Sequence, residues 1–280
     1  MQKTNKIINT WWSKGPHPGN MGDIVTPVIL RDVFGYECQY AHKPFTKPTL
    51  FGAGSIINQA DGHTVVWGSG AMRATDPLKR DARYLSVRGP RTYEMLRSKR
   101  IPCPEIFGDP ALLLPEVYSP ERDVRFEIGM IPHYVDYPKV NGWYVNHKKT
   151  GVPPPHYKYP PPHGVKIRVI DILNGNPLLV VAQMLSCEKI ISSSLHGVIV
   201  AQAYGIPAVW VKHSDKLNGD GTKFHDYFES VGLKAECVDM TQRIDPEDLR
   251  KLNFQAGINI DLNKLKRALQ GYLDELSNSN

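Results

Sequence analysis

The sequence predicts an α/β protein of two domains. Residues 190–211, IISSSLHGVIVAQAYGIPAVWV, contain an apolar run, a serine-rich turn, an apolar helix that stops at Gly205 and a second β-branched run. This order is typical of a strand–turn–helix–strand unit in a parallel sheet. The beginning of the chain repeats the order of strand, glycine-containing loop and helix, and 280 residues suffice for two domains of modest size.

In the first half, we expect a strand over residues 6–12, the loop SKGPHPGNMGD and a helix over 24–34 that ends at Gly35. Two further strands are expected within residues 49–57 and 64–71, each closing in a glycine turn. Neither turn has the full glycine fingerprint of a dinucleotide-binding site, which argues against NAD.

A polar stretch that contains proline, residues 119–123, marks the predicted boundary. We therefore assign residues 1–122 to an N-terminal domain and 123–280 to a C-terminal domain. The second domain is expected to open with a strand over 124–131. Residues 139–164 are too rich in proline for a helix or a central strand, which indicates a long loop. Regular structure resumes with a strand over 166–171, a helix over 177–187 and the unit already described.

Composition narrows the function further. A formal charge of +6 and a pI near 9.0 favour anionic substrates or a membrane surface, but the basic residues form no tract, so nucleic acid binding is not expected. No apolar run has the length of a membrane-spanning helix or of a signal peptide core, which predicts a cytoplasmic protein. The four cysteines lie far apart, which predicts reduced, structural thiols: Cys38, Cys103, Cys187 and Cys237.

The serine-rich turn predicts an anion site. Ser192, Ser193 and Ser194 can cap the following helix, whose N–H groups and positive dipole end attract phosphate or carboxylate. His196 falls in the first turn of that helix and would supply a proton there. A plainer interpretation, in which the serines only cap the helix and the histidine only packs, is equally compatible with the pattern. His133 follows the strand over 124–131 and is expected at the same edge of the second sheet.

Arginines flank another helix start. Arg88 ends an apolar strand, and Arg91 follows Pro90, which is expected at the first position of the next helix. We expect Arg88 to capture an anion and Arg91 to be a solvated surface residue.

Three aspartates also lie in informative places. Asp23 ends the first loop, where it would act as a base or bind a hydroxyl group, or would simply cap the helix. Asp109 precedes Pro110 and is expected to form a turn. Asp226 is expected to pair with Lys223 one helical turn earlier. His156 and His163 have no metal-ligand spacing, so no metal site is predicted.

Taken together and in order, several motifs resemble those of the polysaccharide pyruvyltransferases, which build pyruvate ketals on sugars of bacterial surface polymers. The motifs cover most of the chain and read GNMGDIVTPVILRDVFG, FGAGSI, VWGSG, SVRGPRT with FGDPALLL, IGMIPHY, SSSLHGVIVAQAYGIP and KFHDYFESVG. The resemblance implies two Rossmann-like domains facing a cleft, as in GT-B glycosyltransferases. It also implies phosphoenolpyruvate as the donor, with no metal or other cofactor.

Many family members carry arginine two residues before the motif histidine, where this chain has Ser194, so another cation must bind the donor. The S-S-L-H-G form resembles the branch that modifies exopolysaccharide repeat units. We assign proton transfer to His196, with Asp23 as a second catalytic candidate. Donor binding is assigned to Arg88, His133, Ser193, Ser194, Gly197 and Lys223. Acceptor binding is assigned to Asn20, Gly22, Gly54 and Ser55.

The N-terminal domain is the expected acceptor side and the C-terminal domain the expected donor side. A lipid-linked acceptor would bring the protein to the cytoplasmic face of the membrane, where a basic surface helps. Two other functions remain open: a GT-B nucleotide-sugar glycosyltransferase, and a carbohydrate-binding module in which the histidines merely pack.

Overall fold

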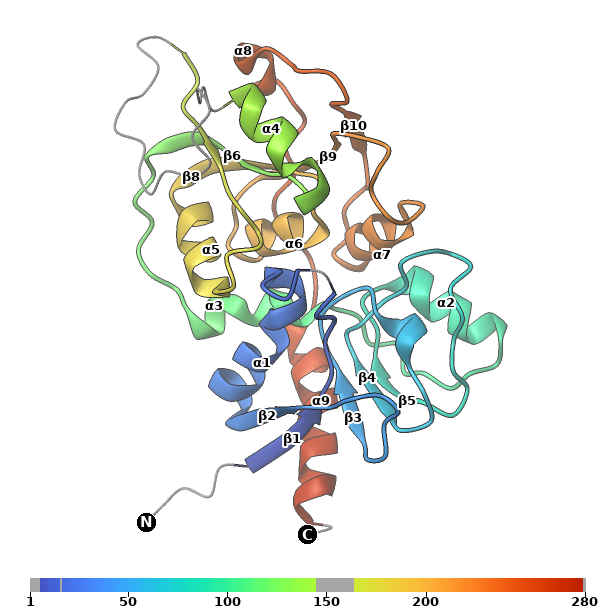
Figure 1. Ribbon diagram of the computed structural model, residues 1–280. Helices are drawn as coiled ribbons and strands as arrows, with labels where there is room; N and C mark the ends of the chain where they lie inside the picture. The colour runs from blue at the N-terminus through green and yellow to red at the C-terminus, as the bar shows by residue number, and fades with distance from the viewer. Residues whose placement is uncertain (1–5, 16, 145–163, 279–280) are drawn as a thin grey trace. The chain divides into compact units, whose positions relative to one another are not determined.

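The chain forms two units, each built on a parallel five-stranded sheet (Figure 1). The computed structural model describes residues 6–15, 17–144 and 164–278. The first unit comprises Met1–Ser119, Asn218–Ala235 and Ile258–Asn280. The second comprises Pro120–Leu217 and Glu236–Gly257.

The first crossing between units, at Ser119 and Pro120, falls at the predicted boundary. The rest of the division differs from the predicted one, which placed all of residues 123–280 in the second domain. Two later segments return to the first unit, and long-range packing explains each return. Helix α7 (Thr222–Ser230) carries a buried ion pair with Arg88, and helix α9 (Leu262–Asn278) packs on the first sheet.

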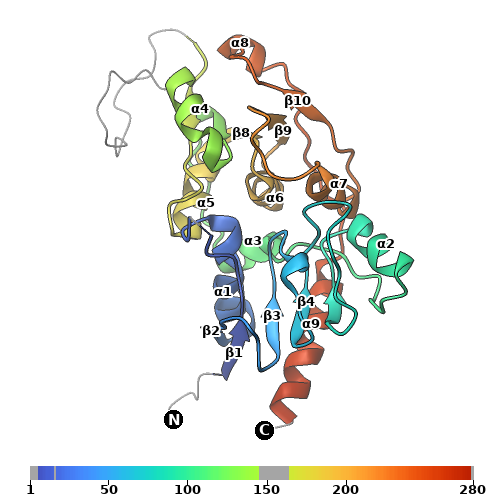
Figure 2. The same ribbon diagram turned by 45° about the vertical axis from the view of Figure 1, so that its right-hand side comes forward.

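The first sheet has the order β2-β1-β3-β4-β5, with every neighbouring pair parallel. Helix α9 runs beside this sheet (Figures 1 and 2). Trp67 Nε1, from β4, donates a 2.9 Å hydrogen bond to the carbonyl of Leu265 in this helix. The elements of this unit, apart from α7 and α9, are β1 (Lys6–Thr10), α1 (Met21–Phe34), β2 (Tyr36–Tyr40), β3 (Thr49–Phe51), η1 (Ile57–Gln59), β4 (Thr64–Trp67), β5 (Arg83–Ser86), α2 (Pro90–Ser98), η2 (Pro110–Leu113) and α3 (Leu114–Val117).

Helix α1 begins three residues earlier than predicted because Asn20 caps it. The Asn20 side chain accepts a 3.2 Å hydrogen bond from the backbone N–H of Gly22. At the other end, Gly35 takes the left-handed conformation (φ 73°) that terminates helices, as predicted. The helix buries Val25 and Ile29 in the core of the first unit.

The second sheet has the order β10-β9-β8-β6-β7, again with parallel neighbours. Counted along the chain from β6, this is the same 2-1-3-4-5 order as in the first sheet, so both units have Rossmann-like topology. The elements are β6 (Phe126–Ile131), η3 (Tyr134–Asp136), α4 (Tyr137–Tyr144), β7 (Ile167–Val169), α5 (Pro177–Leu185), β8 (Cys187–Ser192), α6 (Leu195–Ala203), β9 (Ala208–Lys212), β10 (Cys237–Asp239) and α8 (Pro246–Leu249).

The predicted loop over residues 139–164 is partly wrong. Its first residues, to Tyr144, belong to helix α4, because Val140 is buried and Trp143 packs against the core of the second unit. Residues 145–163, with His156 and His163, lie outside the described residues. Among the helices that the structure describes, none is both long enough and apolar enough to cross a membrane.

Candidate functional site

Each sheet has one place where the strand order reverses, and ligands of such sheets bind outside the carboxyl ends of the strands at that place. In the first unit it lies between β1 and β3, and in the second between β6 and β8. Most of the predicted site residues lie on the segments that follow these four strands. The two places are described separately.

In the second unit, the serine turn is bonded to the end of β6. The Oγ of Ser192 lies 2.9 Å from the carbonyl oxygen of Ile131 and accepts the N–H of Ser194 at 3.0 Å. The Oγ of Ser193 accepts a 2.8 Å hydrogen bond from the N–H of His133. All three serines are buried. The hydroxyls of Ser192 and Ser193 therefore join the ends of β6 and β8. Ser194, at the N-cap, makes no side-chain capping bond, contrary to expectation.

Helix α6 starts directly against these strand ends, and Gly197 makes that possible. A Cβ atom at Gly197 would lie 2.3 Å from Ser192 Oγ and 3.1 Å from Ile131 Cγ2. Packing thus accounts for this glycine, which the sequence assigned to donor binding. The close approach places half-buried His196 in the first turn of α6, at the same sheet edge as half-buried His133. The pairing of β6 with β8 places both histidines at this edge, and that they act in one cleft stays a prediction.

In the first unit, the glycine turn after β3 rests on helix α1. Thr26 Oγ1 accepts a 2.8 Å hydrogen bond from the N–H of Ala53. A Cβ atom at Gly52 would lie only 2.4 Å from Thr26 Cγ2, so no side chain fits there. This contact brings the turn to the beginning of α1, where Asn20 and Gly22 lie.

Asp23 is beside that turn. A Cβ atom built on Gly54 would lie 3.9 Å from Asp23 Oδ1, and the φ of 117° at Gly54 also favours glycine. Asp23 lies inside the first helical turn, and Asn20 is the cap, so the capping role considered for Asp23 is wrong. The structure thus gathers Asn20, Gly22, Asp23 and Gly54 at the β1–β3 edge.

Arg88 proves to be a fully buried anchor. Its Nη1 donates to Ser55 Oγ at 2.7 Å, and its Nη2 donates to the carbonyl of Ala71 at 2.7 Å and lies 2.9 Å from Asp226 Oδ2. With 0% of its surface exposed, the side chain has no face for a ligand, so we reassign it from donor binding to the positioning of Ser55. Arg91 is exposed, as expected, and pairs with Glu229 at 2.7 Å.

Asp226, in α7, caps the N-terminus of helix α2, which lies far from it in the sequence. Its Oδ1 accepts the N–H of Thr92 at 2.9 Å and its Oδ2 accepts the hydroxyl of the same residue at 2.7 Å, in the first turn of α2. The predicted pairing of Asp226 with Lys223 is therefore wrong, because the carboxylate is taken by Arg88 and Thr92. Asp109 forms the expected turn by accepting the N–H of Ala111 at 2.9 Å.

Lys223 is left as a buried cation in the first turn of α7. Only 7% of its surface is exposed, and it has no hydrogen bond or ion pair with any residue in the described ranges. Burial, reinforced by the positive charges of Arg88 and Arg73 and opposed by Asp23, lowers the pKa of Lys223 to about 8. A buried lysine with no directly bonded carboxylate among the described residues, at a helix N-terminus where the dipole is also positive, would be stabilised by a bound anion.

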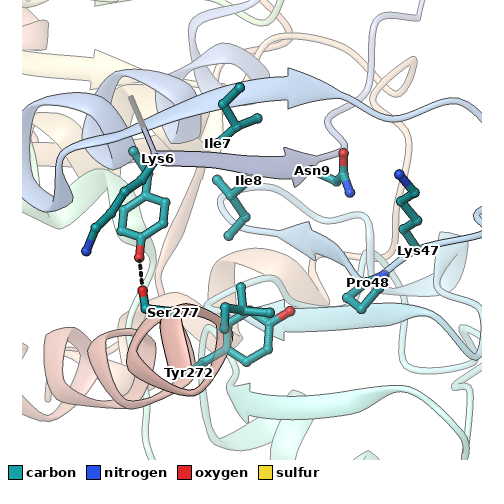
Figure 3. Close-up of a pocket in the computed structure, with 10 residues that line it drawn as sticks. Lys6, Ile7, Ile8, Asn9, Lys47, Pro48, Tyr272 and Ser277 are labelled. Carbon is teal, nitrogen blue, oxygen red and sulfur yellow. Dashed lines mark hydrogen bonds between the residues drawn. The ribbon is translucent and has the colours of Figure 1, made fainter. Parts of the chain in front are cut away.

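The first unit also contains a surface cavity of about 550 Å³, shown in Figure 3. Part of its lining comes from the opposite, amino edge of the sheet, with Lys6 from β1, Tyr36 from the start of β2 and Pro48 ahead of β3. Helix α9 supplies another part of the lining, including Tyr272 and Ser277. The cavity therefore lies away from the edge at which such sheets bind ligands. Among the described residues, no three His, Cys, Asp or Glu side chains are grouped to hold a metal ion.

Comparison with known families is consistent with this arrangement. Residues 30–215, more than half of the chain, match the family model described as polysaccharide pyruvyl transferase. This chain belongs to the polysaccharide pyruvyl transferase family. The matched region includes Gly54, Ser55, Arg88, His133, Ser193, Ser194, His196 and Gly197. Lys223 and the start of α1, with Asn20, Gly22 and Asp23, fall outside it.

Within the curated proteins, one relative of this polysaccharide pyruvyl transferase family member is "Uncharacterized protein L143" of Acanthamoeba polyphaga mimivirus. The two are 32% identical over 187 residues, which is 65% of this chain and 60% of the viral protein. The chain thus matches less than two thirds of that relative's length.

Proposed function

We propose that the protein transfers a pyruvyl group from phosphoenolpyruvate to two hydroxyls of one sugar in a surface or exopolysaccharide repeat unit. The products are a pyruvate ketal and phosphate. Family membership supports the reaction class. The observation that carries the proposal is the position of His196, in the first turn of α6 at the carboxyl edge of the second sheet, beside the end of β6. That is where an anionic donor and a proton donor are both needed.

The chemistry needs one proton at carbon and the removal of two from oxygen. The methylene carbon of phosphoenolpyruvate gains a proton, and the first sugar hydroxyl adds to the neighbouring carbon and loses its proton. The C–O bond to phosphate then breaks, and the second hydroxyl adds and loses its proton. Of the two protons that the hydroxyls release, one balances the proton gained by carbon and the other leaves with phosphate. We assign proton transfer to His196 and expect neither a metal nor a further cofactor.

Donor binding in the second unit is assigned to the edge formed by His133, Ser193, Ser194 and the α6 N-terminus. In the first unit, Lys223 is the proposed anion ligand, because its charge is buried and makes no hydrogen bond or ion pair among the described residues. The GT-B-like cleft of the sequence prediction would let groups from both units act on one donor, and it stays a prediction.

Acceptor binding is assigned to the β1–β3 edge of the first unit. Asp23, which lies beside Gly54 and does not cap α1, would accept a sugar hydroxyl and assist its deprotonation. Ser55, held by Arg88, would orient a second hydroxyl. A free or lipid-linked saccharide would fit this assignment, the latter placing the protein at the cytoplasmic face of a membrane.

Thermal unfolding with candidate donors tests the proposal. A ligand present at about 100 times its dissociation constant stabilises the native state by roughly 2.7 kcal/mol, which is a measurable rise in melting temperature. We expect such a rise with phosphoenolpyruvate and none with UDP- or GDP-sugars. Release of phosphate on adding a panel of p-nitrophenyl glycosides would then identify an acceptor. A rise with nucleotide sugars alone would replace pyruvyl transfer by glycosyl transfer, and no rise with any donor would reject the proposal.

A further inference from the structure

An aromatic cluster lies at the carboxyl edge of the first sheet, next to the β1–β3 edge. Trp11 and Trp12 follow the last residue of β1, and Tyr40 is the last residue of β2. The register pairs Thr10 with Tyr40, and the N–H of Ala41 donates to the carbonyl of Thr10 at 3.0 Å, so both strands end at the same level. The cluster therefore occupies the side of the sheet on which ligands bind.

Trp11 has a structural role in this cluster. Its ring stacks on Phe51 at a centroid distance of 4.9 Å and meets Phe45 edge-on at 6.4 Å, and both phenylalanines are buried. Lys43, whose Nζ lies 5.1 Å from the Trp11 ring, is hydrogen-bonded to Gln59. Packing in the core accounts for Trp11 and internal hydrogen bonds account for Lys43.

Trp12 and Tyr40 are arranged differently, at the surface. Both are only half-buried, with ring centroids 4.7 Å apart at 78°, and the Tyr40 hydroxyl donates to the carbonyl of Trp12 at 3.3 Å. Lys14 is exposed, and its Nζ lies 3.6 Å from the Tyr40 ring centroid and 5.8 Å from that of Trp12. Across the described ranges Lys14 makes no hydrogen bond or ion pair, so its ammonium is held by ring faces alone.

We propose that Trp12, Tyr40 and Lys14 form a saccharide subsite, which holds a sugar ring of the acceptor other than the ring that is modified. The proposal rests on the proposed function for the choice of ligand. A half-buried indole at the surface can present apolar ring atoms to the C–H face of a sugar, and the nearby ammonium can donate to a hydroxyl or carboxylate oxygen. Tyr40 fixes both groups, through its ring contacts and its hydroxyl. The adjoining β1–β3 edge, with Asp23, would receive the ring to be modified.

Fluorine NMR of the full chain labelled with 5-fluorotryptophan tests the subsite. The chain has five tryptophans, and substitution of each by phenylalanine assigns its resonance. The probes are cellotetraose, mannotetraose and a tetrasaccharide that contains glucuronic acid. We expect the Trp12 resonance to move on titration with at least one of them, while that of Trp143, in the second unit, stays in place. Movement of neither, or equal movement of both, would overturn the proposal.

Two variants sharpen the test. Trp12→Ala should weaken saccharide binding about five- to tenfold, the loss expected for one ring contact. Its control is Trp143→Ala, because Trp143 also has a lysine over its ring, with Lys139 Nζ at 4.6 Å. Lys14→Gln should weaken binding of the acidic saccharide, whereas Lys6→Gln should not. Lys6 lies 5.3 Å from the Tyr36 ring at the amino edge of the same sheet and is a matched lysine–tyrosine pair.

The readout separates this proposal from the proposed function. Saccharide binding is measured without phosphoenolpyruvate, and donor binding is measured without saccharide. Trp12→Ala should leave the phosphoenolpyruvate-dependent rise in melting temperature unchanged. A protein that binds saccharide at Trp12 without any response to phosphoenolpyruvate would retain the subsite and lose the pyruvyl transfer assignment. A protein that responds to the donor without a Trp12 response to any of the saccharides would retain only the function.

Discussion

Arg88 and Asp226 form an ion pair of 2.9 Å in which neither side chain is exposed. The pair joins the end of β5 to helix α7, which the chain reaches only after passing through the second unit. The backbone at Gly89 also packs directly against that of α7, since a Cβ atom at Gly89 would lie 1.8 Å from the carbonyl oxygen of Asp226. This contact ties residues 218–235 to the first unit and sets the position of Lys223 one turn earlier in α7.

Loss of the Asp226 carboxylate should therefore destabilise the protein strongly. Asp226→Asn leaves the buried Arg88 guanidinium without its counter-ion, and breaking one partner of a buried pair typically costs about 3–5 kcal/mol. Urea denaturation measures this loss. Glu229→Gln is the matched control on the same helix, because it breaks the exposed pair with Arg91 and should cost less than about 1 kcal/mol. Equal losses in the two variants would contradict the anchoring role.

Removal of the Lys223 charge should have the opposite effect on stability. The pKa of this lysine, about 8 in the folded protein, lies below the ordinary value of 10.5 because of burial and Arg88. Below pH 8 the buried charge of Lys223 therefore lowers the free energy of unfolding, and this destabilisation disappears as the pH rises from 8 to 10.5. Lys223→Met should stabilise the protein at pH 7 by on the order of 3 kcal/mol. The difference in the free energy of unfolding between variant and wild type, measured by urea denaturation, should shrink to zero over that pH range.

The same charge gives a test of donor binding. A bound anion favours the protonated lysine, so the affinity for phosphoenolpyruvate should fall as the pH rises through about 8. In Lys223→Met the affinity should be lower and should lose that pH dependence. Isothermal titration calorimetry between pH 6.5 and 9.5, a range chosen around that pKa, measures both. An unchanged affinity in the variant would remove Lys223 from the donor site.

Gly197→Ala should disturb the start of α6. The added methyl would meet Ser192 Oγ at 2.3 Å, and that hydroxyl is held by Ile131 and Ser194. Overpacking of this kind costs about 1–3 kcal/mol. Gly271→Ala, at an exposed position in α9 with no atom within 4 Å of the new methyl, should instead be stabilising by about 0.5–1 kcal/mol. Melting temperatures of the two variants, measured side by side, should move in opposite directions.

His196→Ala should reduce turnover without removing the donor site. Groups that transfer protons typically contribute about 10²–10⁴-fold, so phosphate release in the presence of acceptor should fall by that factor. The rise in melting temperature with phosphoenolpyruvate should persist, because the N–H groups of α6 and the cation in the first unit remain. His63→Ala, at an exposed turn residue, serves as the control. A His196 variant with near-normal turnover would show that this histidine only packs.

Local sequence patterns were good predictors of the elements that end in a recognisable residue. Gly205 predicts the end of α6 to within one residue, and Gly35 predicts the end of α1. The sequence does not predict the beginning of α1, because Asn20 and Asp23 lie three residues apart and either residue type can cap a helix. Both Asn and Asp cap helices well, so only the hydrogen bond decides between them.

The sequence by itself determined the α/β class, the family and the chemical groups available. Strand and helix periodicity, turn residues and motifs each depend on residues that are close together in the sequence, so they can be recognised without the tertiary structure. The tertiary structure alone decided that α7 belongs to the first unit, that Asp226 pairs with Arg88 instead of Lys223, and that Lys223 is buried. Burial and ion pairing depend on which distant segments meet. A pattern confined to one segment does not show which distant residue pairs with it. The sequence around Arg88 therefore predicts a substrate ligand, whereas the structure pairs Arg88 with Asp226.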